Sequence, residues 1–296
     1  MRLSHNIASL NVYRTYSKVL DKQSDALGKI SSGYKVNTAK DDPNVIAQSE
    51  RMRMQIRGLQ MAGRNAQDGV SMLQTAEGGL DSITSMLQRI RELVVQSGSG
   101  INNSEDKQTI QNEIIQMVDG IKDIANNTEL NGVKMLNPEK DKDGNVVQLT
   151  MAIGANADES VKIPRISLMP ESLSTIDKNT SEELTLEKLK NDYSITKDNS
   201  IDRALTIVDA ALNTVTTIRS KYGALENRFE DSLGNIGEIS DRLEGADSNI
   251  RDADIAQEMI ALTKNNLLAE AGNAMMVQTN KFPQDVLRIL ENVRSR

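Results

Sequence analysis

The sequence predicts a mainly α fold, in which long helices form an elongated antiparallel bundle of the coiled-coil type with a small β-hairpin region. Only two Phe, five Tyr and no Trp occur among 296 residues, which argues against a compact globule with an aromatic core. Two series of apolar residues also repeat every seven positions, and this period keeps one stripe of a helix turned toward a partner helix. The series are Val45, Met52, Leu59, Ala66, Leu73, Leu80, Leu87 and Val94, and Ile201, Val208, Val215, Tyr222, Phe229, Ile236, Leu243 and Ile250.

The two series predict helices of equal length. Each covers about 50 residues, or about 75 Å at roughly 1.5 Å per residue. The long segment between them gives the chain room to turn back. We therefore expect the two helices to pair side by side in opposite directions.

The composition argues against several classes of function. Lys and Arg number 35 against 42 Asp and Glu, a net charge of −7, and no basic stripe interleaved with aromatic residues predicts nucleic-acid binding. The absence of cysteine excludes a thiol nucleophile and a thiolate metal site. No stretch approaches the roughly 20 apolar residues that cross a bilayer, and the N-terminal residues lack the apolar segment of a cleavable signal peptide. We expect no nucleic-acid partner, no membrane insertion and, if the protein is exported, another export route.

The first predicted helix spans residues 3–30 and has a weak apolar pattern. Ser31-Ser32-Gly33 follows it, and glycine is suited to end a helix. The first long helix then begins at Asp41-Asp42-Pro43, because a carboxylate caps free N–H groups and proline is tolerated in a first turn. Gly78-Gly79 should weaken this helix by about 1 kcal/mol per glycine without breaking it. Gly98-Ser99-Gly100 should end it.

Shorter elements are predicted between the two long helices. Apolar residues at spacings of four and three indicate a third helix with Ser104 as its cap and an end near Asn126-Asn127. Residues 133–170 alternate like strands around the turn signal Asp143-Gly144-Asn145. Residues 171–199 are polar and predict a short surface connection. The second long helix starts at Ser200.

The last segment resembles the first in having a thin apolar pattern. After Ile255, Met259 and Leu262, Asn occupies every seventh place where the long helices have apolar residues: Asn266, Asn273 and Asn280. Asn on a buried seam fixes register at a cost in stability. The two ends of the chain are therefore predicted to be its weakest helices.

No group of residues predicts catalysis, a cofactor or a metal site. His5 is the single histidine and has no partner for a catalytic dyad or triad. Asp141, Asp143 and Asn145 alternate like the start of a calcium loop, but Ala152 occupies the place of the closing Glu, which favours a hairpin turn. We expect a protein that is not an enzyme.

Many short motifs, in one order along the chain, resemble those of bacterial flagellin. On the N-terminal side they are His5-Asn6-Ile7, Ser31-Ser32-Gly33, Ala39-Lys40-Asp41-Asp42, Ile56-Arg57-Gly58-Leu59, Arg64-Asn65-Ala66-Gln67-Asp68-Gly69, Thr75-Ala76-Glu77-Gly78, Leu87-Gln88-Arg89-Ile90-Arg91-Glu92-Leu93 and Glu129-Leu130-Asn131-Gly132. On the C-terminal side they are Gly223-Ala224-Leu225-Glu226-Asn227-Arg228, Ile250-Arg251-Asp252-Ala253-Asp254 and Glu270-Ala271-Gly272-Asn273-Ala274-Met275.

The resemblance implies a structural subunit that polymerises into the flagellar filament for motility. Residues 1–42 and 251–296 would form an inner domain of terminal helices in the filament core. Residues 43–170 and 200–250 would form the helical rod domain with a β-hairpin at about 133–170, and the connection 171–199 replaces the outer domains of larger flagellins. The implied location is extracellular, in the flagellum, after type III export without a cleaved signal.

The resemblance also implies partners and site residues. The partners are further copies of the chain, an export chaperone, the filament cap, hook-junction proteins and the innate immune receptor Toll-like receptor 5. The receptor-binding positions are Gln88, Arg89, Leu93, Gln96 and Glu113. The polymerisation positions of the inner core are Leu3, Ile7, Leu10, Leu20, Leu27, Ile255, Met259, Leu262, Ala269 and Met276.

The weak ends and the strong centre predict different behaviour in the free subunit. Burial of the long apolar series should fold the middle domain in the monomer. The end helices have fewer apolar positions, so we expect them to order only when neighbouring subunits complete their packing. Two alternatives remain at this point: another flagellar axial or junction protein, and a soluble coiled-coil adaptor.

Overall fold

The computed structural model describes residues 6–138, 146–176, 183–191, 195 and 200–294, with side chains to residue 288. It contains two compact units. The rod unit is Arg57–Ser240, and the terminal unit is Met1–Ile56 together with Asp241–Arg296. The predicted mainly α class is confirmed: the long helices are α1 (Ile7–Ser32), α2 (Pro43–Ser97), α3 (Ser104–Asn127), α4 (Ile201–Arg251) and α5 (Ile255–Arg294).

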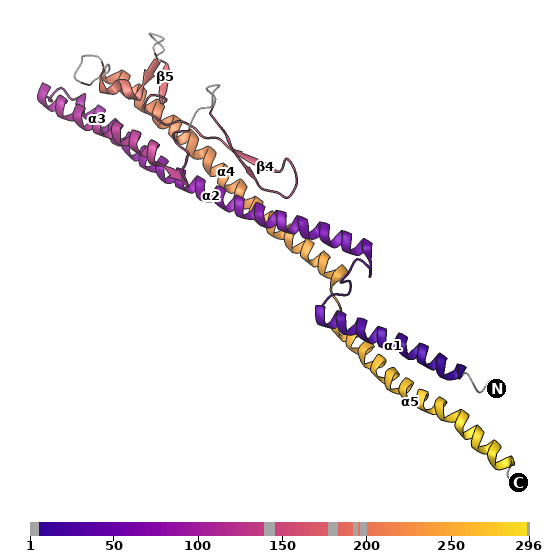
Figure 1. Ribbon diagram of the computed structural model, residues 1–296. Coiled ribbons are helices and arrows are strands. Elements are labelled where there is room, and N and C mark those ends of the chain that lie inside the picture. The colour runs from indigo at the N-terminus through magenta and orange to yellow at the C-terminus, as the bar shows by residue number, and fades with distance from the viewer. Residues whose placement is uncertain (1–5, 139–145, 177–182, 192–194, 196–199, 295–296) are drawn as a thin grey trace. The chain divides into compact units, whose positions relative to one another are not determined.

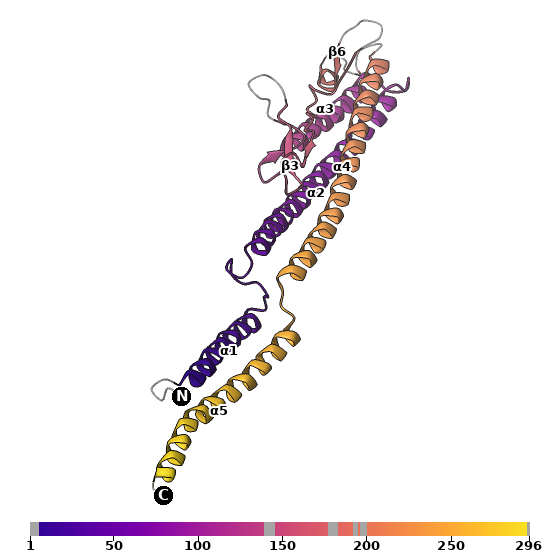
Figure 2. The ribbon, with the colours of Figure 1, turned by 90° about the vertical axis from the view of Figure 1, so that its right-hand side faces the viewer.

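In the rod unit, α2 and α4 lie side by side with α3 along α2 (Figures 1 and 2). Polar pairs show that α2 and α4 are antiparallel: Gln74 Nε2 donates to Glu226 Oε1 at 2.8 Å, and Arg91 pairs with Asp209 at 2.8 Å. The heptad positions within the rod unit are buried except Ile201, which is partly buried. The buried positions are Leu59, Ala66, Leu73, Leu80, Leu87 and Val94 of α2, and Val208, Val215, Tyr222, Phe229 and Ile236 of α4.

Gly79 has a packing role in α2. The helix continues through Gly78-Gly79, as predicted. A Cβ atom on Gly79 would lie 2.7 Å from Thr128 Oγ1 and 2.9 Å from Leu136 Cδ1. The end of α3 and the segment after it therefore approach the α2 backbone closely. A larger residue at position 79 would clash with them, which explains the glycine inside this helix.

The predicted cap of α3 is wrong by one residue. Asn103, not Ser104, is the N-cap: its side chain accepts a hydrogen bond from the Asp106 N–H, and Asp106 accepts one from the Asn103 N–H. This reciprocal pair satisfies two N–H groups at the helix start. Ser104 is the first helical residue.

The segment 171–199, expected to be a surface connection, contributes to the core. Its described residues include β5 (Ser174–Ile176), β6 (Glu183–Thr185) and the 3₁₀ helix η1 (Leu186–Lys190). Buried Gln111 of α3 donates to the carbonyl of Leu189 at 2.8 Å and accepts from the N–H of Ile195 at 3.1 Å. The buried apolar residues of the segment are Leu173, Leu184, Leu186, Leu189 and Ile195. Their spacings of 11, 2, 3 and 6 residues are uneven, so the sequence shows no periodic signal.

The β-hairpin consists of β3 (Leu149–Ala152) and β4 (Ser160–Ile163), which pair antiparallel with Leu149 opposite Ile163. The turn between them is at residues 153–159. The predicted turn at residues 143–145 lies outside the described residues. A smaller hairpin joins β1 (Glu129–Leu130) to β2 (Val133–Lys134).

Tyr222 connects α4 to the chain after this hairpin. Its ring is 1% exposed, and its hydroxyl donates to the Pro164 carbonyl at 2.9 Å. Burial of the phenol raises the pKa of Tyr222 to about 12 because the charged phenolate is disfavoured away from water.

Alkaline unfolding should reflect this tyrosine. An unfolded tyrosine has a pKa of about 10, so between about pH 10 and 12 the folded state binds the phenol proton more tightly than the unfolded state. The free energy of unfolding should be constant with respect to this group below pH 10 and fall as the pH rises toward 12. Tyr222→Phe should lower stability by about 0.5–1.5 kcal/mol at neutral pH and flatten the alkaline fall. Urea titrations at several pH values measure both effects, and an equally steep fall in the Phe variant would contradict the assignment.

In the terminal unit, α1 and α5 form an antiparallel pair (Figures 1 and 2). Gly33 ends α1 with φ 75°, and its N–H donates to the Lys29 carbonyl, as expected of a glycine C-cap. The predicted start of α2 is confirmed: Asp42 accepts hydrogen bonds from the N–H groups of Asn44 and Val45.

Candidate self-assembly surface

The seam between α1 and α5 consists mostly of small, polar or short side chains. Lys29 pairs with Glu258 at 3.5 Å, and Gln23 donates to Asn266 Oδ1 at 2.8 Å. The less exposed positions of α1 recur every three or four residues, at Val12, Tyr16, Val19, Gln23, Ala26 and Ile30. Those of α5 are Glu258, Leu262, Asn265, Ala269, Gly272, Met276 and Thr279. Such a seam buries little apolar surface.

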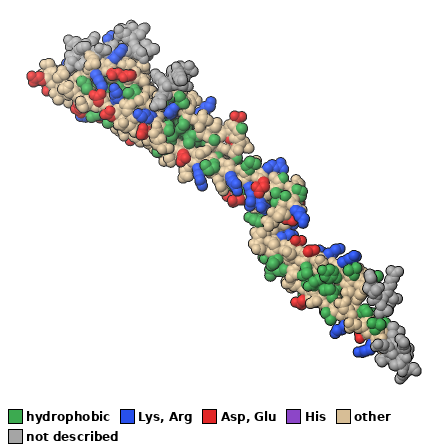
Figure 3. All heavy atoms as spheres, viewed as in Figure 1, with side chains coloured by type: hydrophobic (Ala, Val, Ile, Leu, Met, Phe, Trp, Pro, Cys, Tyr) green, Lys and Arg blue, Asp and Glu red, His purple; other side chains and the backbone are tan. Residues whose placement is uncertain are grey.

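The large apolar side chains of the terminal unit lie mainly outside this seam. Among the described residues, 15 of the 20 large apolar side chains that are exposed belong to the terminal unit, whereas only 4 of the 40 buried apolar residues do. Figure 3 shows such side chains gathered in green on the visible face of this unit. The exposed set is Ile7, Leu10, Tyr13, Leu20, Leu27, Met54, Ile255, Met259, Ile260, Leu267, Leu268, Met275, Val277, Phe282 and Leu287.

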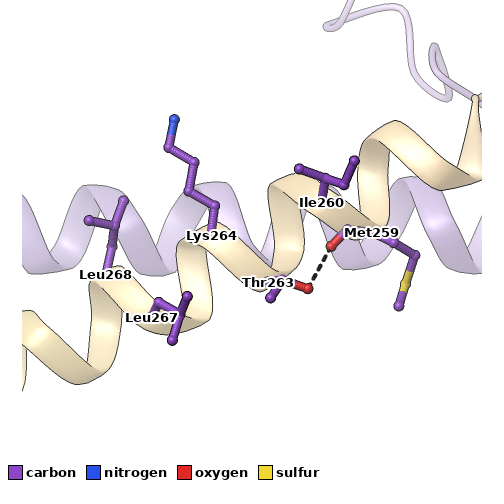
Figure 4. A pocket seen from close by; sticks show the side chains of 6 residues that line it. All are labelled: Met259, Ile260, Thr263, Lys264, Leu267 and Leu268. Atoms are coloured by element: carbon purple, nitrogen blue, oxygen red, sulfur yellow. Dashed lines mark hydrogen bonds between the residues drawn. The ribbon is translucent and has the colours of Figure 1, made fainter.

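A shallow groove follows part of this surface on α5 (Figure 4). Its six lining residues come from successive turns of the one helix: Met259, Ile260, Thr263, Lys264, Leu267 and Leu268. The Thr263 hydroxyl donates to the Met259 carbonyl at 2.8 Å, so its proton is already used within α5. The groove therefore presents an almost entirely apolar surface.

Most residues expected to form the inner core are on the exposed side of their helices. Ile7 is 64% exposed and Leu27 57% exposed, and Leu10, Leu20, Ile255 and Met259 are 40–48% exposed. Leu262, Ala269 and Met276 are half-buried in the seam with α1. Leu3 lies outside the described residues.

The sequence reasoning missed the α1 side of the seam. Val12, Val19 and Ala26 are seven residues apart, and Tyr16, Gln23 and Ile30 each follow four residues later. This is a heptad pattern of the same kind as in the long helices. It was hidden because a Gln and an Ala occupy seam positions while larger apolar residues occupy neighbouring positions.

A second cluster of side chains surrounds Tyr34, where the connection between α1 and α2 meets the connection between α4 and α5. The Arg251 guanidinium lies 4.7 Å and that of Arg53 5.9 Å from the centre of the Tyr34 ring, within the range of cation–π contacts. Arg251 also donates to Ser49 Oγ at 3.2 Å, and Arg53 donates to Asp247 at 3.3 Å. Although burial acts against its charged form, hydrogen bonds to Asp247 and Tyr34 raise the pKa of Arg53.

The Tyr34 ring should therefore hold the connection at residues 33–42 against proteolysis. Tyr34→Ala removes both cation–π contacts and should increase the initial rate of tryptic cleavage after Lys35 and Lys40 several-fold, since each contact contributes about 0.5–2 kcal/mol. Tyr34→Phe keeps the ring and should cleave at nearly the original rate. Mass spectrometry of the early fragments measures both rates. Equal rates in the Ala and Phe variants would contradict this role of the ring.

The expected receptor-binding residues are on α2 and α3 in the rod unit. Arg89 donates through Nε and Nη2 to Glu113 Oε1 at 3.1 and 3.0 Å, and through Nη1 to Glu92 at 3.1 Å. These bonds, chiefly that to Glu113, raise the pKa of the exposed Arg89 side chain. Gln88 and Gln96 are also exposed. Leu93 is only 1% exposed because it packs in the core, so it cannot contact a partner directly.

The described residues offer neither a membrane span nor a metal centre. Within the described part of the chain, none of the helices combines the length and apolar character needed to cross a membrane. No three His, Cys, Asp or Glu side chains among these residues are placed to bind a metal ion together. His5 and the calcium-loop positions 141, 143 and 145 lie outside them.

Comparison with known proteins decides the family. Residues 3–141 match the bacterial flagellin N-terminal helical region, and residues 205–290 match the bacterial flagellin C-terminal helical region. The flagellin of Bacillus subtilis (strain 168) is 40% identical over 303 residues, covering 98% of this chain and 100% of that protein. The chain belongs to the bacterial flagellin family. A flagellar filament 30.7 kDa core protein of Treponema maltophilum is 37% identical with the same coverage.

Flagellins are structural subunits of the flagellar filament, and membership of this family confirms that the chain is not an enzyme. The fold is shared more widely. The crystal structure of FlgL from Bacillus cereus matches with a TM-score of 0.51 at 15% identity, covering 67% of this chain and 99% of that chain. Because identity to the flagellins is high over the whole length, the sequence distinguishes this chain from a junction protein or an unrelated adaptor.

Proposed function

We propose that this flagellin polymerises through its terminal unit and that α1 and α5 become fully ordered only in the filament. The supporting observation is the unequal distribution of apolar side chains: the terminal unit has most of the exposed large ones and a tenth of the buried ones, among the described residues. Apolar patches of this kind on a soluble protein usually mark an interaction surface.

The energetics favour coupling between order and assembly. Ordering a residue costs about 1–2 kcal/mol in backbone entropy, and among the described residues of α1 only Val19 and Ala26 are buried. Burying the outward side chains against neighbouring subunits would add about 1.5–3 kcal/mol for each large apolar residue. Residues 1–42 and 251–296 would then form the inner domain of the filament, and residues 43–170 and 200–250 the surrounding rod domain.

The exposed side chains lie on more than one side of the α1–α5 pair. On α5, Ile260 and Leu267 are near one face, whereas Ile255, Met259 and Val277 are near another at helical spacing. Contacts between different faces are heterologous and, when they do not close, produce a helical filament. The same surface would bind the export chaperone before assembly and the cap and hook-junction proteins at the filament ends, outside the cell.

Electron microscopy of the purified protein tests polymerisation. Seeding with short fragments or salting out is expected to give long, uniform filaments because salt strengthens apolar association. The rod unit alone, residues 57–240, provides the control without the terminal unit. Uniform filaments from that fragment, or none from the whole chain, would contradict the proposal.

We also propose that the exposed face of α2 and α3 around Arg89 binds the innate immune receptor for flagellin. Arg89 is held in place by Glu92 and Glu113, so little side-chain freedom remains to be lost on binding. Gln88, Glu92, Val95 and Gln96 line a shallow depression beside it. Leu93 would act only by supporting this face from the core.

Receptor binding should depend strongly on Arg89. Arg89→Ala is expected to weaken binding of monomeric flagellin to Toll-like receptor 5 at least tenfold, as for an Arg at the centre of an interface. Arg228→Ala changes an exposed arginine on α4 and serves as a control. Surface plasmon resonance measures the affinities, and circular dichroism checks the fold. Equal affinity of the Arg89 and Arg228 variants would contradict the assigned face.

A further inference from the structure

The Asn6 side chain makes two hydrogen bonds, one within α1 and one to α5. Its Oδ1 accepts from the backbone N–H of Ser9 at 3.1 Å, which caps the first turn of α1. Its Nδ2 donates to the backbone carbonyl of Thr279 at 3.0 Å. The two functions use opposite ends of the same amide.

The Thr279 carbonyl lacks its usual donor within α5. In an α-helix this carbonyl would accept from the N–H of the residue four positions later. That residue is Pro283, which lies inside α5 and has no N–H. Because Asn6 and Thr279 are partly buried, water cannot fully replace the missing donor, and an unpaired carbonyl there would cost free energy.

We propose that Asn6 is a positioning residue for filament assembly, whose side-chain amide replaces the N–H that Pro283 lacks and so fixes the register of α1 on α5. The proposal rests on the self-assembly proposed above and identifies the contact that aligns the assembling surface. It assigns Pro283 a specific purpose: the proline leaves one carbonyl of α5 open for one side chain of α1.

The rest of the seam specifies this register only weakly. The less exposed positions of both helices repeat every seven residues. A slide of one heptad, about 10 Å at roughly 1.5 Å per residue, therefore again places seam positions opposite seam positions. The Gln23–Asn266 and Lys29–Glu258 pairs are exposed or partly exposed and contribute little. Pro283 is the proline within α5, so only one register brings Asn6 to the carbonyl that it opens.

Register matters because the outward apolar side chains come from both helices. Leu20 of α1 lies beside Gln23, Asn266, Ala269 and Asn273 in one surface depression. A slide by one heptad would separate the parts of α1 and α5 that a neighbouring subunit must contact together. The contact of Asn6 at one end of α1 prevents such a slide.

Asn6→Asp should keep the capping hydrogen bond of this residue and remove its bond to Thr279. Asp caps a helix as well as Asn does, but its carboxylate cannot donate to Thr279. We expect the critical concentration for polymerisation to rise about two- to tenfold, while the urea unfolding of the rod unit stays unchanged. Asn6→Ser also keeps a capping oxygen and loses the long donor, so it should have the same effect without adding a charge.

Pro283→Ala provides the matched background. It restores the N–H at position 283, so the Thr279 carbonyl no longer needs the Asn6 amide, and Asn6→Asp should then change the critical concentration less than about twofold. An equal change in both backgrounds, or no change in the original chain, overturns the proposal. Failure of the unaltered chain to form filaments contradicts the proposed self-assembly instead.

A direct measurement does not depend on how Pro283→Ala affects assembly. Solid-state NMR of labelled filaments of the unaltered chain should show a through-space contact between Asn6 Nδ2 and the Thr279 carbonyl carbon. Absence of this contact in well-ordered filaments would also overturn the proposal.

Discussion

Deletion of residues 1–32 should abolish filament formation and leave the rod unit folded. The deletion removes α1, the partner of α5 in the terminal unit, together with the exposed residues Ile7, Leu10, Tyr13, Leu20 and Leu27. It leaves intact the rod unit, which holds 36 of the 40 buried apolar residues among those described. Sedimentation and electron microscopy measure assembly, and thermal unfolding by circular dichroism measures the fold.

A substitution variant tests whether the exposed apolar side chains of α1 are needed, rather than the helix as a whole. Leu10, Leu20 and Leu27 changed together to Ser keep the length of α1 and its buried Val19 and Ala26. This variant should also fail to polymerise, with the unfolding midpoint of the rod unit unchanged. Normal filaments from either variant would show that α1 is not the assembly element.

Truncating a buried and an exposed leucine should have contrasting effects: the first mainly on folding stability, the second mainly on assembly. Leu80 is fully buried in the rod unit, whereas Leu267 of α5 is 62% exposed. Leu80→Ala should lower the free energy of unfolding by about 2–5 kcal/mol because it leaves a cavity. Leu267→Ala should change it by less than about 0.5 kcal/mol, as exposed substitutions usually do.

Assembly should reverse this order. If Leu267 is buried by a neighbouring subunit, its truncation should raise the critical concentration at least tenfold, since burying a leucine contributes about 1.5–3 kcal/mol. Leu80→Ala should change the critical concentration less, provided that the temperature keeps the variant folded. Urea unfolding and sedimentation of the same preparations give both numbers. A Leu267→Ala chain that assembles normally would indicate that the groove on α5 remains exposed in the filament.

Periodic packing is the part of the fold that could be predicted from the sequence. Leu59 to Val94 and Val208 to Ile236 are buried because a repeat of seven fits a helix pair of any length. Local chemistry likewise predicted the end of α1 at Gly33 and the start of α2 at Asp42. In both cases the determining residues are near one another in the sequence.

Features that depend on distant residues could not be predicted. The segment 171–199 has few large apolar residues, and its burial depends on contacts with α3 such as those of Gln111. Leu93 resembled a surface residue by family position, although its place three residues after Ile90 matches the packing stripe. The α1 seam was missed because the largest apolar residues of α1 are on its exposed side.

Hydrogen exchange of the monomer and of the filament tests most directly whether the terminal helices order on assembly. In the monomer, we expect amides of α1 and of α5 to exchange quickly, while those of α2–α4 in the rod unit are protected by its core. In the filament, the same α1 and α5 amides should become strongly protected. Slow, cooperative exchange throughout α1 and α5 in the monomer would contradict the account.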